Sequence, residues 1–104
     1  MNKKIFELQK MFQDNVGNDV SSQEFRNQMF YALIAEVVEA GNETPWKPWK
    51  NKQEFNSEKF LEELADVQLF LVNLVLSSGK SYDEFTKIIE NKIEKNFKRQ
   101  KNDY

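Results

Sequence analysis

The chain contains no cysteine and no histidine. Without cysteine it can form no disulfide, thiolate nucleophile or sulfur metal site, and without histidine it has no imidazole base and no usual zinc or copper ligand. A bound metal would therefore have oxygen ligands and would be a hard ion such as Mg²⁺, Mn²⁺ or Ca²⁺. In an enzyme of this composition, carboxylates, lysines or tyrosines would have to move the protons.

Glycine and proline are also scarce, with three and two residues respectively among 104. Runs of β-branched residues are scarce too, and both features favour helices over a sheet. The net charge of −2 gives no reason to expect a nucleic-acid partner. No apolar run reaches about 18 residues and no signal-peptide core opens the sequence, so we expect no membrane partner and a cytoplasmic location. The length is that of one domain, which we assign to residues 1–104.

Apolar side chains recur at helical spacing in two segments of the first half of the chain. The first segment runs from about residue 4 to residue 15, and Gly17 ends it. The second runs from about residue 22 to residue 40. It begins at the sequence "SSQE", where Ser21 and Glu24 form a predicted capping box, and Gly41 is its expected left-handed C-cap.

Two more helices are predicted after a loop at residues 42–57, which contains both prolines. The third begins near residue 56 and ends near Gly79, and its middle is apolar on nearly every side, as is typical of an enclosed central helix. The fourth begins at a second capping box, from Ser81 to Glu84, and continues to about residue 97. These segments predict an all-α fold, a small four-helix bundle. Because three short helices barely cover a central helix of this kind, we expect at least a homodimer, or a higher homo-oligomer.

Two pairs of carboxylates lie on helix faces where apolar residues are expected. Glu36 and Glu39 share the apolar stripe of the second helix, and Glu63 and Asp66 share that of the third. The members of each pair are three residues apart, so their Cβ atoms lie about 5–6 Å from each other. If the two stripes face each other, four carboxylates converge, and their mutual repulsion requires a counter-charge. Mg²⁺, with Mn²⁺ as a substitute, has the preference for oxygen ligands that such a site needs.

Pairs of this spacing are also abundant on the solvent-exposed faces of helices, where they bind nothing. Two features favour a metal site over a solvated face. Both pairs lie on apolar stripes, and the chain has no histidine or cysteine to form a metal site of another kind. Glu62 provides a matched comparison, because it points about 100° away from Glu63 and should be solvated.

The predicted loop contains the sequence "WKPWK". A base could stack on Trp46 or Trp49 while Lys47 and Lys50 contact phosphate oxygens. The alternative is that the two rings only hold the loop against the helices.

The fourth helix carries a surplus of basic residues. Lys92, Asn96 and Arg99 fall on one side of it together with Gln100, and an arginine fork beside a lysine suits a polyphosphate. Four acids, a metal and such a basic strip are what a nucleoside triphosphate site requires. The alternatives are a solvated helix face and a weak nucleic-acid patch.

The segments "ALIAEVVEAGNETPWKPWK" and "FLEELADVQLFLVNL" resemble the all-α nucleoside triphosphate pyrophosphohydrolases, which include the MazG-like proteins and the dimeric dUTPases. Their shared ExxE and ExxD motifs correspond here to Glu36, Glu39, Glu63 and Asp66. The loop "WKPWK", the tail "KIEKNFKRQ" and the stretch "ELQKMFQD" near the start are similar to the dimeric dUTPases in particular. The chain is shorter than most dimeric dUTPases and has the size of the compact MazG-like proteins.

The resemblance implies Mg²⁺-dependent hydrolysis of a deoxynucleoside triphosphate to the monophosphate and pyrophosphate. The four acids would hold the metal and carry out catalysis, with one glutamate orienting the attacking water. The implied phosphate site consists of Lys47, Lys50, Lys92, Asn96 and Arg99, and the implied nucleoside site consists of Gln9, Trp46, Trp49, Phe70 and Asn73.

We expect dUTP to be the favoured substrate, and a broader or dCTP-preferring MazG-like enzyme is the near alternative. Two further alternatives belong to other classes: a nucleotide- or metal-binding module without turnover, and a helical adaptor whose acidic stripe pairs with a basic partner. The adaptor requires the four acids to be exposed, whereas the metal site requires them to converge.

Overall fold

The protein folds into four α-helices. The computed structural model describes residues 1–102 and contains α1 (Lys3–Val16), α2 (Gln23–Asn42), α3 (Ser57–Ser77) and α4 (Tyr82–Lys101), with no strand in that range. The predicted all-α class is therefore confirmed, and the loop at residues 43–56 agrees with the predicted position. Among the helices of residues 1–102, none is long and apolar enough to cross a membrane.

Two of the predicted helix ends agree with the structure. Gly17 caps α1 in the left-handed conformation with φ of 84°, and its N–H donates to the carbonyls of Gln13 and Asp14. At the start of α4, the Ser81 hydroxyl accepts from the backbone N–H of Glu84 at 3.1 Å, and the Glu84 carboxylate accepts from that of Ser81 at 3.2 Å. This is the predicted capping box, in which two otherwise unpaired backbone donors are satisfied.

The capping box predicted at Ser21 is wrong by one residue. Ser22 is the N-cap of α2, and its side chain accepts from the backbone N–H of Phe25 at 3.0 Å. The Ser21 hydroxyl instead donates to a carboxylate oxygen of Asp19 at 2.6 Å. The short polar side chain of Asp19 holds Ser21 in a local turn, so the helix begins one residue later.

The predicted C-cap of α2 is wrong as well. Gly41 lies inside the helix, and the C-cap is Glu43, which has a right-handed conformation. The carbonyl of Gly41 accepts from the Thr44 backbone N–H at 3.0 Å and from the Thr44 hydroxyl at 2.6 Å. The last turn of a helix has carbonyls without helical partners, which a left-handed cap usually satisfies. Here Thr44 donates to the Gly41 carbonyl instead, so the helix ends without a left-handed residue.

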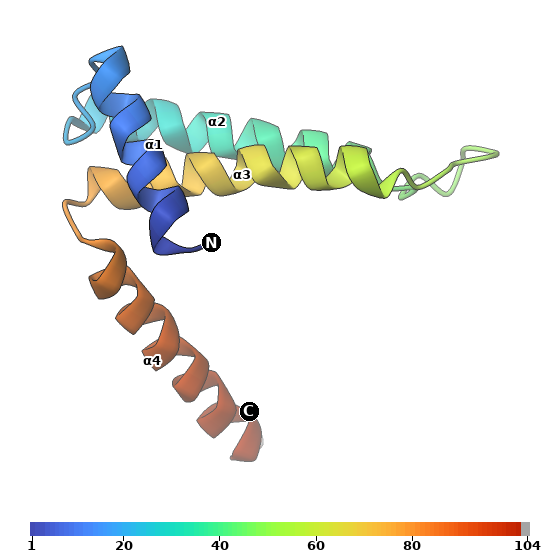
Figure 1. The fold of residues 1–104 in the computed structure, drawn as a ribbon. Coiled ribbons are helices and arrows are strands. Elements are labelled where there is room, and N and C mark those ends of the chain that lie inside the picture. Colours follow the sequence, from blue (N-terminus) through green and yellow to red (C-terminus); the bar gives the residue numbers. More distant parts are fainter. Residues whose placement is uncertain (103–104) are drawn as a thin grey trace.

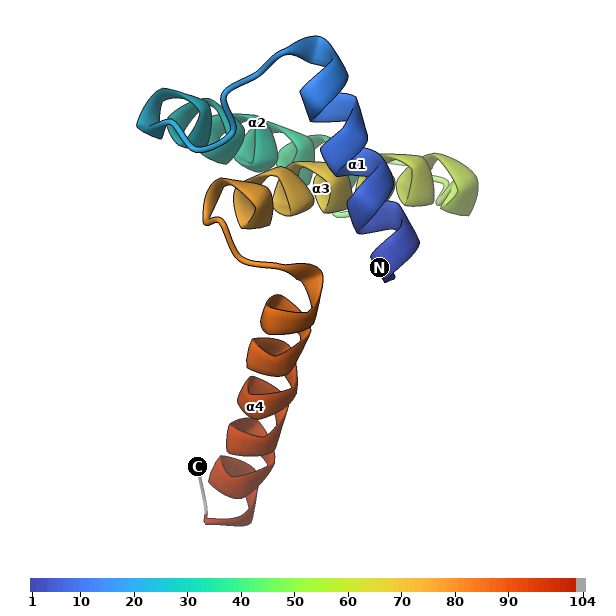
Figure 2. The ribbon, with the colours of Figure 1, turned by 60° about the vertical axis from the view of Figure 1, so that its left-hand side comes forward.

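α2 and α3 lie side by side and antiparallel, and α1 crosses them (Figures 1 and 2). The buried apolar cluster consists of Phe6 of α1 and Val72, Val75 and Leu76 of α3, with Tyr82 and Phe85 packed against it. Arg26 fastens α2 to the end of α3. Its guanidinium Nη2 donates to the Ser77 carbonyl at 2.9 Å, at a helix end where carbonyls lack helical partners.

Because of the position of α4, the chain is extended rather than compact. This helix extends away from the other three (Figures 1 and 2), and the radius of gyration is 17.0 Å, against about 13 Å for a compact domain of 100 residues. The predicted enclosure of the third helix is seen in its second half, where Val72 is fully buried, whereas Leu61 in its first half is 61% exposed. Large apolar side chains such as Tyr31 and Phe97 are also exposed.

Candidate functional site

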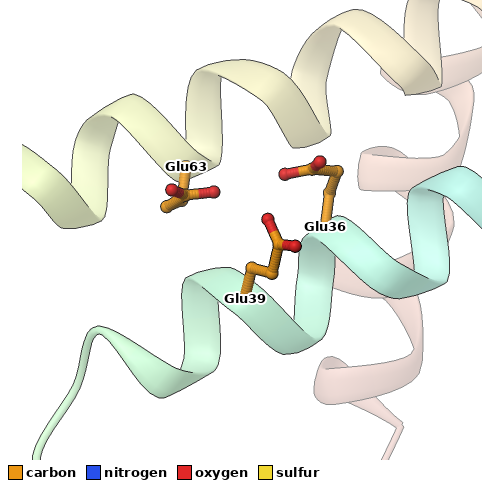
Figure 3. A group of neighbouring side chains, drawn as sticks. All are labelled: Glu36, Glu39 and Glu63. Carbon is orange, nitrogen blue, oxygen red and sulfur yellow. The ribbon is translucent and has the colours of Figure 1, made fainter.

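Three of the four predicted acidic residues come together between α2 and α3. Glu36 and Glu39 project from α2 and Glu63 projects from α3, and their carboxylates point toward one another (Figure 3). One carboxylate oxygen from each residue lies within 4.8 Å of the others. Asp66 lies one turn further along α3 and is exposed. We refer to Glu36, Glu39 and Glu63 as the acidic cluster.

The acidic cluster is partly withdrawn from water. Glu36 and Glu63 are half-buried, whereas Glu39 is exposed. The Oε2 atom of Glu36 is buried and has no hydrogen-bond partner within residues 1–102. Because a buried carboxylate oxygen without a donor is costly, this atom indicates that a cation or a proton belongs beside it.

The electrostatics of the acidic cluster follow from burial and from repulsion. Burial raises the pKa of Glu36 to about 7, and the negative charge of Glu39 contributes in the same direction, followed by those of Asp66 and Glu63. Burial and the charge of Glu39 also raise the pKa of Glu63, with a smaller contribution from Asp66. Asp66 therefore acts electrostatically on two members of the cluster although it lies outside it.

The ion pairs seen in the structure lie elsewhere. They join Lys3 to Asp83, Lys80 to Glu84 and Lys98 to Glu94, and all six side chains are exposed. The charge of the acidic cluster is therefore not offset by any of these pairs. Convergent carboxylate oxygens of this kind are the donor set that a hard divalent cation prefers.

A pocket of about 370 Å³ adjoins the acidic cluster and is formed by α1, α2 and α3. It brings together three of the five residues predicted for the nucleoside site, Gln9, Phe70 and Asn73. The Gln9 side-chain nitrogen donates to the Asn73 side-chain oxygen at 3.0 Å. Asp66 also lines the pocket, so one residue connects the pocket with the acids of α2 and α3.

The structure adds four residues to the pocket that were not assigned to it from sequence: Phe12, Gln13, Met29 and Leu69. Gln13 is the most informative of them, because it is polar and only 4% exposed. It follows Gln9 by four residues on α1, and two glutamines at this spacing lie on one face of a helix. That spacing is the signal from which Gln13 could have been found.

The loop residues lie apart from this pocket. Trp46 and Trp49 contact each other edge to face at 5.6 Å, and the Lys47 ammonium lies 5.6 Å from the Trp46 ring. The loop projects beyond the ends of α2 and α3 (Figure 1), where Trp46, Lys47 and Lys50 line a hollow of their own. Within one chain, the described residues do not bring Trp46 or Trp49 to the pocket that contains Asn73, so their role in the nucleoside site stays a prediction.

The basic strip on the fourth helix is also separate from the acidic cluster. Lys92, Asn96 and Arg99 are exposed on α4, which extends away from α2 and α3 (Figures 1 and 2). In the single chain described by residues 1–102, these basic residues do not lie beside Glu36, Glu39 and Glu63. Its role in phosphate binding stays a prediction.

Comparison with known proteins identifies one family for the chain. A family model described as dUTPase matches residues 2–104, which include all four helices, the acidic cluster and the pocket. No curated protein and no solved structure matches the chain.

Proposed function

We propose, from the premise that the chain belongs to the dUTPase family, that it hydrolyses a deoxynucleoside triphosphate, with dUTP favoured, to the monophosphate and pyrophosphate. Membership of the family confirms the resemblance seen in the sequence and supports nucleoside triphosphate pyrophosphohydrolase activity in general. The observation that carries the finer proposal is the position of Asp66, which lines a largely apolar pocket and whose charge adds to burial in raising the pKa of Glu36 and of Glu63 in the acidic cluster. Residues 1–104 would form one catalytic domain.

The proposed cofactor is Mg²⁺, with Mn²⁺ as a substitute. The residues fit such an ion, because three carboxylates from two helices converge and one of their oxygens is buried without a partner. Glu36, Glu39 and Glu63 would hold it, with Asp66 at the edge of the site. When bound, a divalent cation neutralises negative charge on the triphosphate oxygens.

Side chains of the pocket and of the acidic cluster would bind the nucleoside and activate the water. Leu69 and Phe70 provide apolar surface for a base, and Gln9 and Asn73 provide polar groups in the same pocket. A nucleoside held there would direct its phosphates past Asp66 toward the acidic cluster. One glutamate of the cluster would orient the attacking water and accept its proton.

We further propose that the protein acts as a homodimer or a higher homo-oligomer. The single chain is more extended than a compact domain, and it leaves apolar residues such as Tyr31, Ile34 and Phe97 exposed. A second copy would cover these faces, and its α4 could supply Lys92 and Arg99 to the phosphates. Sedimentation at micromolar concentration should show a dimer or larger species, and a monomer alone would contradict the proposal.

The test of the activity is a release assay across the four common dNTPs and dUTP, in which pyrophosphate and phosphate are measured separately. Pyrophosphate release that is fastest with dUTP supports the proposal, and fastest release with dCTP would favour the MazG-like alternative. Glu63→Gln should abolish release, whereas Glu62→Gln should not, because Glu62 is exposed beside it. Absence of release, together with no thermal stabilisation by Mg²⁺ either alone or with a non-hydrolysable triphosphate, would favour the adaptor.

A further inference from the structure

The side-chain amide of Gln53 closes the loop that follows α2. Its oxygen accepts from the Lys47 backbone N–H at 3.1 Å, and its nitrogen donates to the Lys47 carbonyl. The same nitrogen donates to the Lys50 carbonyl at 3.3 Å. Gln53 therefore satisfies both backbone polar groups of Lys47, as a neighbouring strand would. Gln53 and Lys47 are half-buried, whereas residues 48–52 between them are exposed.

The backbone beside Gln53 indicates that the loop is held in one specific shape. Lys52 has a φ of 53°, in the left-handed region that residues with a Cβ atom rarely adopt. A residue keeps such a conformation only when its surroundings impose it. The next residue is Gln53, whose hydrogen bonds to Lys47 and Lys50 hold the chain where it turns back.

The residue that this loop fixes is Lys47. Its backbone is held by Gln53, and its ammonium lies 5.6 Å from the centre of the Trp46 ring. The Trp46 indole Nε1 donates to the Asn42 side-chain oxygen at 3.2 Å, and the Trp49 ring contacts it edge to face. Trp46 and Trp49 are 53% and 69% exposed, so they are not buried anchors of the loop. A lysine side chain is ordinarily flexible, whereas this one is held at both ends.

The Lys47 ammonium lies near the acidic cluster and forms no ion pair within residues 1–102. It lines a hollow of about 260 Å³ together with Glu43, the C-cap of α2. α2 ends only three residues beyond Glu39 (Figure 3). Burial is the main cause of the raised pKa of Glu63, and the charge of Glu43 contributes to it. A triphosphate bound through a metal at the acidic cluster would therefore have a fixed positive charge at the same end of α2.

We propose that Gln53 is a positioning residue, which holds Lys47 in place before the substrate binds so that its ammonium meets a phosphate group of the triphosphate. Gln53 acts through Lys47 and does not itself contact the substrate. A loop that is already ordered lowers the cost of binding, because no side chain has to be immobilised at that step. The inference rests on the proposed function, because it concerns the triphosphate of the same site.

Gln53→Met tests the inference, because it removes the amide and keeps the length and the charge of the side chain. Both tryptophans of the chain lie in this loop, so intrinsic fluorescence reports on the loop alone. It can follow the binding of a non-hydrolysable dUTP analogue in the presence of Mg²⁺. The Kd for the analogue should rise roughly tenfold, because the ordering of Lys47 moves to the binding step. The Kd for deoxyuridine, which has no phosphate, should not change. The fluorescence anisotropy of the free variant should fall as the indole rings become more mobile.

Asn51→Leu is the matched control. Asn51 is exposed in the same loop, makes no side-chain hydrogen bond within residues 1–102, and loses an amide of similar shape without a change of charge. Its Kd for the analogue should stay at the wild-type value, and thermal denaturation shows whether each variant is folded. A Gln53→Met protein that weakens deoxyuridine and the analogue equally would show that Gln53 only maintains the fold, which would overturn the inference.

A double-mutant cycle with Lys47→Met shows whether Gln53 acts through Lys47. In the Lys47→Met protein, Gln53→Met should raise the Kd for the analogue by less than about twofold, because the charge that it positions is already absent. Independent effects of the two substitutions, or an unchanged Kd in folded Gln53→Met, would overturn the inference and leave the proposed activity standing. A wild-type protein that binds the analogue but hydrolyses no dNTP would overturn the proposed function alone, because the cycle measures binding. One that does not bind the analogue would overturn both.

Discussion

Glu36→Gln should make the metal-free protein more stable above neutral pH and remove its response to Mg²⁺. The substitution keeps the shape of a half-buried side chain and deletes its charge, which the charges of Glu39, Glu63 and Asp66 oppose. The buried oxygen without a partner would become part of an amide that carries no net charge. Without a bound cation, the negative charge of Glu36 destabilises the folded protein, so its removal should increase stability.

The pH window of the effect follows from the two pKa values of Glu36. Burial and the neighbouring carboxylates raise its pKa from 4.5 to about 7 in the folded protein. Between these values the folded state keeps a proton that the unfolded state has lost, so unfolding releases a proton and rising pH favours unfolding. The contribution of Glu36 to stability should fall as the pH rises from about 4.5 to about 7 and should then stay constant. The glutamine of Glu36→Gln does not titrate, so the stability of this variant should not decrease through this group over the same pH range.

Mg²⁺ should reverse the loss in the wild-type protein. A ligand present at 100 times its Kd stabilises the folded state by about 2.7 kcal/mol. For a domain of about 100 residues, each kcal/mol shifts Tm by about 4–8 °C, so the expected rise is about 10–20 °C. Glu36→Gln should show little of this rise, and its hydrolysis rate should fall about a hundredfold or more, which is about 2.7 kcal/mol in the barrier.

Thermal denaturation from pH 4 to pH 9, with EDTA or with excess Mg²⁺, measures both effects. Glu62→Gln is the control, because Glu62 carries the same charge and is exposed beside the cluster. It should follow the wild-type curves under both conditions. A Glu36→Gln protein that loses stability across the same pH window as the wild type, or keeps the full Mg²⁺ shift, would refute this account of the acidic cluster.

Three further predictions concern the core, the start of α2 and the basic strip. Val72→Ala should lower the free energy of unfolding in urea by about 2 kcal/mol, because Val72 is fully buried, and a change of less than about 0.5 kcal/mol would contradict its place in the core. Ser22→Ala should cost about 1 kcal/mol as the loss of an N-cap, and Ser21→Ala should cost less; the opposite order would contradict the observed cap. Arg99→Lys keeps the charge and loses the planar fork, so it should raise the Kd for a non-hydrolysable triphosphate more than that for the nucleoside, and equal changes would count against a phosphate role.

The sequence by itself determined the helices and their acidic faces. Apolar spacing, the Ser81 capping box and Gly17 are local features, and local backbone and capping energetics suffice to place α1 and α4. The i, i+3 spacing likewise put Glu36 and Glu39 on one face, since helical periodicity alone determines which residues share a face. These predictions needed no knowledge of which helix packs against which. Membership of the family was visible from the same motifs.

The tertiary structure decided what periodicity leaves open. Helical spacing does not fix how far one helix is shifted or rotated against its neighbour, and that shift brings Glu63 into the acidic cluster while Asp66 lines the pocket. It also does not reveal which buried amides meet, so the contact of Gln13 with Asn73, 60 residues apart, appears only when α1 crosses α3. The direction of α4 depends on long-range packing of an exposed apolar face, and local sequence carries no information about what covers it.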